Sequence, residues 1–443
     1  MEIFDFYLDE WGVEEWQSLV HVCRRWRSLV LGSPRRLNLQ IYCSPNKRVR
    51  DMLDVWPAFP LIVGGTVYLS GMDNVIAALE QSNRVRKVEL LYLSGWQAEP
   101  VLATMQVPFP ELTDLHLSSN GEILSVIPDS FLGGSAPRLQ TFRLFGLPFP
   151  GLPKLLLTAT HLVTLSVSYI PHSGYISPEA IAALISTLSN LEELTLDFQS
   201  PQSRPDRESS PSKRSVIPAL ISLHFKGVVE YLENLVTHID TPQLERLDIA
   251  FFNQVDFHTP RLAQFFDRTP KLAKHYAFTQ FDDNIARVGL SSRTETTLEI
   301  AILCKVPDWQ LSSIEQVCNY SSPLLSKVED LFIDHEYRQR ARAWSDGIVE
   351  NTLWLQLLRP FTAVKNLYLC ELLAPGIAVA LQQLVEGRIT EVLPSLQTIS
   401  VERFEPSGSF EEIIGQFITA RQLSDRPITI SYWGNSTDDV ARK

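Results

Sequence analysis

The sequence predicts an α/β fold in which strand–helix layers repeat along most of the chain, after a short helical segment at the N-terminus. Three observations support this prediction. A spaced apolar pattern recurs from Val85 onward, proline precedes many of its copies, and helical patterns lie between them. One such layer is too small to bury its own apolar face, so neighbouring layers must stack on it. The predicted architecture is therefore a solenoid of irregular βα repeats.

The first elements of the chain are predicted to be two short helices. Residues 16–34 carry apolar side chains at three- and four-residue steps, which indicates one amphipathic helix that ends at Gly32 and Pro34. Its predicted apolar face consists of Trp16, Leu19, Val20, Cys23, Trp26 and Val30. A shorter apolar helix precedes it within residues 1–11. Helices this short bury little surface by themselves, so the apolar face must pack on the rest of the chain or on another protein.

This segment resembles an F-box, the helical module by which substrate receptors attach to a cullin–RING ubiquitin ligase. The matching residues are Glu2-Ile3-Phe4, then Leu19, Val22-Cys23-Arg24, Trp26 and Leu29, and finally Ser33-Pro34. F-boxes usually open with Leu-Pro before the position of Ile3. This sequence starts at Met1 without that opening, which leaves a longer natural start or a degenerate F-box as alternatives.

The resemblance implies that residues 1–37 dock on the Skp-type linker subunit of the ligase. The residues implied in that contact are Ile3, Phe4, Leu19, Val22, Cys23 and Trp26. Some of them, Trp26 especially, would instead pack within the module. The alternative is a helical cap, because a solenoid needs terminal units that cover its core.

Residues 38–84 are expected to form a linker and a first repeat-like unit, and residues 85–443 the repeats. Each expected strand has apolar residues at its first, fourth and sixth positions. The copies are Val85/Val88/Leu90, Leu112/Leu115/Leu117, Leu139/Phe142/Leu144, Leu162/Leu165/Val167, Leu191/Leu194/Leu196, Leu220/Leu223/Phe225, Leu244/Leu247/Ile249, Val328/Leu331/Ile333, Val364/Leu367/Leu369 and Leu396/Ile399/Val401. Leu272 and the segment around Leu298 and Ile300 fit the pattern less cleanly.

Proline lies two residues before the first apolar position in six copies, at Pro110, Pro137, Pro218, Pro242, Pro270 and Pro394. Proline is tolerated at the first residue of a strand but not in its middle, so each strand is expected to follow a proline turn. Helices are expected between the strands, over residues 178–188, 228–238, 260–268, 309–320, 348–358, 377–385 and 410–422. Ser177 is the expected N-cap of the first of these, with Pro178 following it.

The repeats resemble leucine-rich repeats, and Leu112-x-x-Leu115-x-Leu117-x-x-Asn120 is the best match to that family's pattern. Most other copies lack the asparagine, so the repeats are degenerate as well as irregular in length. A doubly wound α/β domain also alternates strands and helices and is the alternative. Its strands usually read as continuous apolar runs, whereas these alternate polar and apolar residues.

One insertion interrupts the repeats at Gln199–Ser215, which is rich in serine, proline and charge. We expect a disordered surface loop there. Ser200-Pro201 and Ser210-Pro211 are candidate phosphorylation sites, with a tolerated insertion as the alternative.

Composition excludes several classes of function. The chain has 443 residues and a net charge of −12, which argues against a general nucleic-acid binder. It contains no apolar run long enough for a membrane span and no basic-then-apolar signal region at residue 1. Its five scattered cysteines indicate reduced thiols in the cytoplasm or nucleus.

Sequence motifs for catalysis are absent. The sequence contains no glycine-rich phosphate loop, no H-E-x-x-H, no paired C-x-x-C and no G-x-S-x-G. We therefore expect no cofactor, no metal site and no enzymatic activity. An enzyme on an α/β fold is kept as a further alternative, because catalytic groups converge in space rather than in sequence.

A binding surface is the remaining candidate for function. In each expected strand the residue before the last apolar position faces outward, and stacking should align these residues in one column. They are Glu89, His116, Arg143, Ser166, Thr195, His224, Asp248, Phe332, Tyr368 and Ser400. The candidates for target binding are Glu89, His116, Arg143, His224, Asp248, Phe332 and Tyr368. Two of these residues, Phe332 and Tyr368, resemble aromatic interface anchors, and Trp344 and Trp354 lie near them in sequence. The alternative for every residue of the column is that it only keeps its strand solvated.

Together, the two resemblances imply a substrate-recognition adaptor of an SCF ubiquitin ligase. It would be a monomer within that complex and would present an unidentified target protein for ubiquitination. The alternative is an interaction scaffold outside any ligase, whose N-terminal helices only cap the solenoid.

Overall fold

The computed structural model describes residues 20–32, 39–66, 71–121, 126–201, 214–254, 256–292, 295–336, 351–384, 388–402 and 409–433. Contacts divide the chain into a first unit, Met1–Gln199, and a second unit, Ser200–Lys443. Most of the loop expected at 199–215 lies outside the described residues. The two units are described separately.

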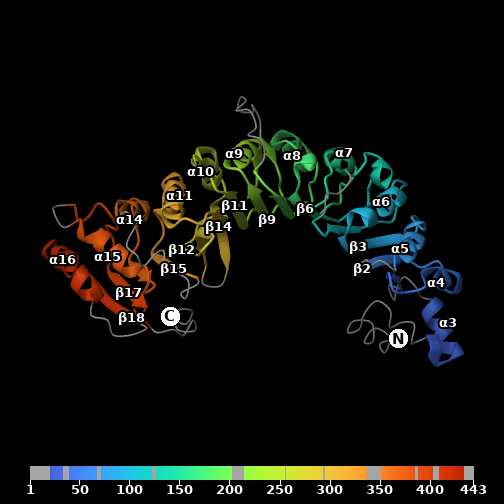
Figure 1. The fold of residues 1–443 in the computed structure, drawn as a ribbon, viewed down its shortest axis with the longest axis horizontal. Helices are drawn as coiled ribbons and strands as arrows, with labels where there is room; N and C mark the ends of the chain where they lie inside the picture. The colour runs from blue at the N-terminus through green and yellow to red at the C-terminus, as the bar shows by residue number, and fades with distance from the viewer. Residues whose placement is uncertain are drawn as a thin grey trace. The chain divides into compact units, whose positions relative to one another are not determined.

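The first unit is a succession of strands and short helices (Figure 1). Its elements are α3 (Arg24–Gly32), β1 (Ile41–Cys43), α4 (Val49–Val55), β2 (Leu61–Thr66), α5 (Met72–Leu79), β3 (Val85–Leu93), α6 (Gly95–Thr104), β4 (Asp114–Ser119), η1 (Phe131–Gly134), β5 (Thr141–Phe145), α7 (Leu152–Leu156), β6 (Thr164–Ile170), η2 (His172–Gly174), α8 (Pro178–Ile185) and β7 (Glu193–Phe198).

The second unit also alternates strands and helices. Its elements are β8 (Ser215–Val216), β9 (Ser222–Gly227), α9 (Val229–His238), β10 (Ile239–Asp240), β11 (Arg246–Phe252), α10 (Pro260–Asp267), η3 (Pro270–Leu272), β12 (Tyr276–Phe281), β13 (Ile285–Ser291), β14 (Thr296–Leu303), α11 (Pro307–Tyr320), α12 (Ser322–Leu325), β15 (Asp330–His335), α14 (Asn351–Leu358), β16 (Asn366–Leu369), α15 (Ala374–Gln382), β17 (Thr398–Glu402), α16 (Ser409–Leu423) and β18 (Thr429–Trp433).

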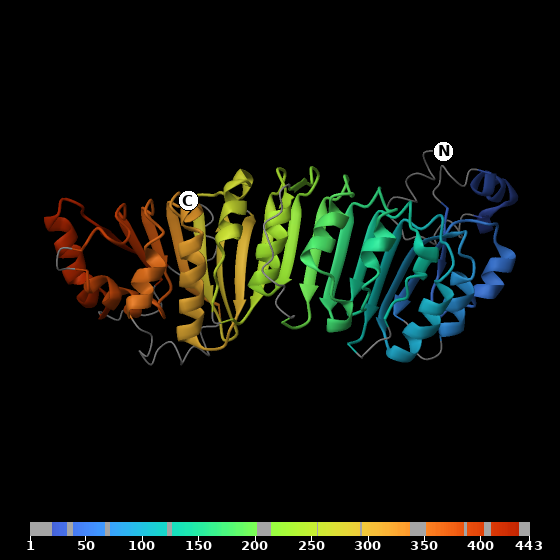
Figure 2. The ribbon, with the colours of Figure 1, turned by 90° about the horizontal axis from the view of Figure 1, so that it is seen from above.

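Strands β1 to β7 pair in chain order, and every pair is parallel. Figures 1 and 2 show the helices along one face of the strands in each unit, while no described helix covers the other face. Burial alternates accordingly, as in β4, where Leu115 and Leu117 are fully buried and His116 between them is partly exposed. One-sided coverage is the arrangement of a leucine-rich-repeat-like solenoid, and the doubly wound alternative is wrong because its helices lie on both faces.

A β-turn precedes many strands and explains the repeated proline. The Leu112 N–H donates to Phe109 O (3.2 Å) across Pro110, and Leu139 donates in the same way to Ala136 O (3.2 Å). Proline therefore occupies the second turn position, where its fixed φ is favourable. The expected proline turn is confirmed at Pro110 and Pro137, and the same bond closes the turns at Pro242, Pro270 and Pro394. In every copy except that of Val85, which begins β3, the first apolar residue precedes the strand, as at Leu112, where β4 begins only at Asp114.

The second unit departs from a simple repeat between β11 and β15. Its strand order is β9-β11-β14-β13-β12-β15-β16-β17-β18, with β13 antiparallel to both of its neighbours. Three strands thus stand where the sequence pattern became unclear around Leu272, Leu298 and Ile300. β14 lies parallel to β11 and β12 lies parallel to β15, so the insertion preserves the direction of the strands on both sides.

Helix starts in the second unit are capped by side chains from neighbouring layers. Gln254 follows β11, and its Oε1 accepts the Val229 N–H at the start of α9 (2.9 Å). Glu233 lies in α9 and accepts the N–H groups of Arg261 and Leu262 at the start of α10 (3.1 and 2.7 Å). Because the first N–H groups of a helix lack partners within it, these bonds join each layer to the next.

The helices expected between strands are confirmed as α8, α9, α10, α11, α14, α15 and α16, within a few residues at their ends. Ser177 caps α8 as expected, because its Oγ accepts the Ala180 N–H (3.2 Å). The prediction that Trp354 belongs to an interface is wrong. It lies in α14 at 2% exposure, with its ring edge-on to Phe281, and therefore belongs to the core rather than to a binding surface.

The helix expected over residues 16–34 is not continuous. Residues 20–22 and 24–32 are helical, with a break at Cys23. At this break the Arg27 Nε donates to Val20 O (3.0 Å), so a side chain replaces the backbone donor that a regular helix would supply. Within the described ranges, no helix combines the length and the apolar character needed to cross a bilayer.

Candidate functional site

In the first unit, the uncovered sheet face carries one column of outward-facing side chains. The strand registers place Glu89, His116, Arg143, Ser166 and Thr195 beside one another on β3 to β7. The Lys87 ammonium bonds to Glu89 (2.8 Å) and holds the pKa of that carboxyl below its ordinary value. Burial lowers the pKa of His116. This part of the column is polar and of mixed charge.

In the second unit, the same row of residues runs through the inserted strands. Successive registers join His224, Asp248, Glu299, Gly289, Phe278, Phe332, Tyr368, Ser400 and Ser431. The sequence pattern identified five of these and missed the other four. Phe278, Gly289 and Glu299 lie in β12, β13 and β14, where the apolar spacing gave no clear strand, and Ser431 lies in β18.

Three aromatic side chains adjoin in the middle of this column. We call Phe278, Phe332 and Tyr368, on β12, β15 and β16, the aromatic shelf. The Phe332 and Tyr368 rings are stacked, with centroids 4.2 Å apart and planes inclined by 6°. Parallel register makes this stacking possible, because it places the two side chains directly opposite each other.

Gly289 makes room for the third ring. A Cβ atom at this position would lie 2.4 Å from the Phe278 Cζ and 2.7 Å from the backbone oxygen of Leu298. The Phe278 ring therefore occupies the space that any other residue at position 289 would fill. β12 and β13 are paired here, so glycine on one strand fixes where the aromatic ring of the other can lie.

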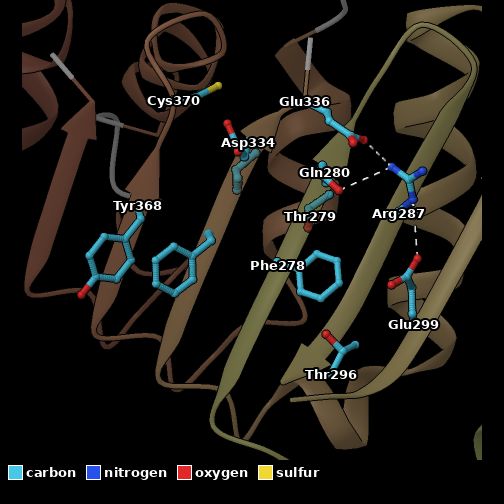
Figure 3. A pocket seen from close by; sticks show the side chains of 12 residues that line it. Phe278, Thr279, Gln280, Arg287, Thr296, Glu299, Asp334, Glu336, Tyr368 and Cys370 are labelled. Carbon is cyan, nitrogen blue, oxygen red and sulfur yellow. Dashed lines mark hydrogen bonds and ion pairs between the residues drawn. The ribbon is translucent and has the colours of Figure 1, made fainter. Parts of the chain in front are cut away.

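Charged side chains surround the Arg287 guanidinium beside the shelf. Arg287 contacts Glu336 (3.0 Å), Asp282 (3.3 Å) and Glu299 (3.5 Å). Figure 3 shows Arg287 between Glu336 and Glu299, with Gln280 also bonded to it. Burial raises the pKa of Glu299, and the nearby Asp248 carboxylate adds to that shift. One cation is therefore shared by several carboxylates.

A pocket of about 420 Å³ joins the shelf to these charges (Figure 3). Its lining residues are Phe278, Thr279, Gln280, Arg287, Thr296, Glu299, Phe332, Ile333, Asp334, Glu336, Tyr368 and Cys370. Burial raises the pKa of the Cys370 thiol to about 12, so this cysteine is not a thiolate nucleophile at neutral pH. Over the described part of the chain, no group of His, Cys, Asp and Glu side chains is arranged to hold a metal ion.

The structure brings His224 and Asp248 together as well, with 2.7 Å between His224 Nδ1 and Asp248 Oδ2. This pair lies in the same column, on β9 and β11, and Asp248 is the direct neighbour of Glu299 in the pocket. Its side chains are partly exposed. The predicted target-binding residues of the second unit thus share one sheet face with the pocket.

The N-terminal candidates are only partly described. Ile3, Phe4 and Leu19 lie outside the described residues. Val22 is 60% exposed, Cys23 is exposed and Trp26 is half-buried. Val20 and Val30 of the expected apolar face are buried, whereas Leu29 is 47% exposed. Apolar side chains of this segment therefore divide between the core and the surface.

Comparison with known proteins adds little. No family model matches the chain, and no curated protein matches it. Among solved structures, the chain is similar to the leucine-rich repeat-containing protein LegL7 from Legionella pneumophila, with 13% identity, 88% of this chain and 99% of that chain covered, and a TM-score of 0.29. A TM-score this low supports no argument. The leucine-rich-repeat-like architecture therefore rests on the strand registers and the one-sided helix layer described above.

Proposed function

We propose that this chain is a receptor that binds a target polypeptide on the uncovered face of its sheet and performs no covalent chemistry. The aromatic shelf carries this proposal. Stacked, partly exposed aromatic rings beside a pocket supply large contact areas at low entropic cost, and such residues dominate the binding energy of protein interfaces. Their place in a continuous column lets a partner contact several strands at once.

We further propose that the receptor serves as the substrate-recognition adaptor of an SCF ubiquitin ligase. The F-box resemblance of residues 1–37 supports this, and so does the exposure of Val22, Cys23 and Leu29 within that motif. Docking on the Skp-type linker would hold a bound target near the ligase, so that ubiquitin transfer becomes effectively intramolecular. The adaptor would then act through proximity.

A scaffold outside any ligase is the second candidate. The burial of Val20 and Val30 favours it, because a helix that caps a solenoid packs its apolar side chains on the chain itself. The His21 ring also lies edge-on to Trp56, at 6.3 Å between centroids, which ties the segment to the residue that follows α4.

Binding of the full chain to a purified Skp-type linker, measured by calorimetry, separates the two candidates. We expect binding that Val22→Asp weakens by about tenfold or more, since a carboxylate would be desolvated in an apolar contact. Val55→Asp is the matched control, because Val55 is 73% exposed and lies in α4, outside the motif. If the wild-type chain fails to bind, or both variants bind equally well, the ligase proposal is wrong.

A further inference from the structure

The aromatic shelf lies in a strongly acidic part of the second unit. Strands β12, β15, β16 and β17 contain no lysine or arginine, while Asp330 and Asp334 lie at outward-facing positions of β15. Burial raises the pKa of Tyr368, and the nearby Asp330 carboxylate adds to that shift. A ligand that reaches the shelf therefore enters a field of negative charge.

The pocket itself has the same imbalance. Three carboxylates line it, from Glu299, Asp334 and Glu336, against the single guanidinium of Arg287. Two of them, Glu299 and Glu336, already contact Arg287, together with Asp282 outside the lining. The positive charge of Arg287 is thus compensated within the protein, and the charge left over is negative.

Aromatic faces and uncompensated carboxylates are complementary to one ligand chemistry, an organic cation. The negative face of an aromatic ring attracts a guanidinium or ammonium group, and carboxylates bond to the N–H groups of the same cation. Arginine suits both features better than lysine, because its planar group stacks on rings and offers several donors. Phosphates and nucleic acids would be repelled by the same carboxylates.

We propose that the pocket over β14, β13, β12, β15 and β16 binds an arginine side chain of a basic polypeptide segment that lies along the column. The proposal rests on the receptor function proposed above and specifies the chemistry of its target. A polypeptide fits better than a free amine, because the pocket opens onto a sheet face whose outward side chains continue beyond it, to the partly exposed Asp248 and His224. The pocket volume of about 420 Å³ suffices for a side chain, and the neighbouring strands contact the flanking residues.

The test is the binding of fluorescein-labelled peptides to the full chain at physiological ionic strength, followed by anisotropy. The probe consists of Gly-Ser-Arg repeats, and the matched peptide carries citrulline, a neutral isostere, in place of arginine. We expect the citrulline peptide to bind about tenfold more weakly or worse. Equal binding of the two peptides would overturn the proposal, and so would tighter binding of a lysine peptide.

Variants of the protein locate the site. Tyr368→Leu should weaken binding of the arginine peptide about threefold or more, because it keeps an apolar side chain but removes the ring face. Its control is Tyr92→Leu, the same change at a tyrosine that is 63% exposed in the first unit. Asp334→Asn should weaken binding about two- to fivefold, whereas Asp267→Asn, on the surface of α10, should not.

Two outcomes would overturn the proposal without touching the receptor function. If Asp334→Asn and Asp267→Asn weaken binding equally, the peptide responds only to net charge. If spermine binds as tightly as the peptide, with the same dependence on Tyr368, the pocket is a small-amine site. The Skp-type linker assay with Val22→Asp tests the ligase role separately, and target crosslinking at position 332 tests the receptor function, so failure of the pocket is distinguishable from failure of either.

Discussion

Replacing Gly289 by alanine is the sharpest perturbation that the structure suggests. The added Cβ would lie 2.4 Å and 2.5 Å from two atoms of the Phe278 ring and 2.7 Å from the backbone oxygen of Leu298. The ring belongs to β12 and the oxygen to β14, so the new methyl group is confined by both neighbours of β13. A side-chain rotation relieves the first contact, but only a backbone shift relieves the second.

The expected cost follows from these distances. Inserting a methyl group into a packed site typically costs about 1–3 kcal/mol through forced side-chain and backbone shifts. The backbone contact places Gly289→Ala toward the upper part of that range. In the double variant with Phe278→Ala, the ring contact disappears while the Leu298 contact stays, so we expect the two effects to be non-additive.

Hydrogen exchange of the amides in β12, β13 and β14 measures this effect where it arises. We expect Gly289→Ala to lower the free energy of local opening by about 2 kcal/mol. Gly415→Ala is the control. No atom lies within 4 Å of its added Cβ, and it falls inside α16, so alanine should raise stability by about 0.5–1 kcal/mol. Unchanged exchange in Gly289→Ala would refute the assigned packing of Phe278 against this glycine.

Three further predictions concern stability. Glu233→Ala should destabilise the chain by about 1–3 kcal/mol in urea unfolding, because it leaves the Arg261 and Leu262 N–H groups at the start of α10 without their acceptor; an effect below about 0.5 kcal/mol would contradict the capping role. Arg421→Met should lower the free energy of unfolding by about 1–3 kcal/mol, because the fully buried guanidinium donates to Ile389 O, Leu393 O and Leu396 O. Arg426→Met is the control at an exposed arginine and should change stability little, so equal effects of the two variants would refute this assignment. Burial raises the pKa of Glu299 above its ordinary value of 4.5, so its stabilising contribution is present below that pH and is lost as pH rises through the folded pKa. Glu299→Gln should therefore gain stability relative to wild type across that window, and a pH-independent difference would show the assigned direction to be wrong.

The regular part of the fold follows from local sequence patterns. An apolar residue at every second strand position reports one-sided burial, and proline before Leu112 or Leu139 reports the turn that precedes the strand. Because stacked layers repeat this geometry, the outward column could be placed from spacing alone. The binding role of the column stays a prediction.

The inserted strands could not be placed in the same way. β12, β13 and β14 are joined by antiparallel pairing, and their order in the sheet depends on which strand meets β11, a long-range contact that short patterns do not report. Nothing in the sequence marks Gly289 as special, because the need for glycine there comes from its contact with the Phe278 ring. Trp354 was misassigned for a related reason, since sequence proximity to Tyr368 does not tell the helix layer from the sheet face.

The central claim is that a target polypeptide binds the uncovered sheet face at the aromatic shelf. Photocrosslinking tests it most directly, with benzoylphenylalanine at position 332 or, as control, at position 309, where Trp309 is 57% exposed on α11 in the helix layer. In extracts of cells that express the protein, we expect a discrete adduct from position 332 that the Gly-Ser-Arg peptide competes away and the citrulline peptide does not, and none from position 309. Identical adducts from both positions, or none from position 332, would contradict the account.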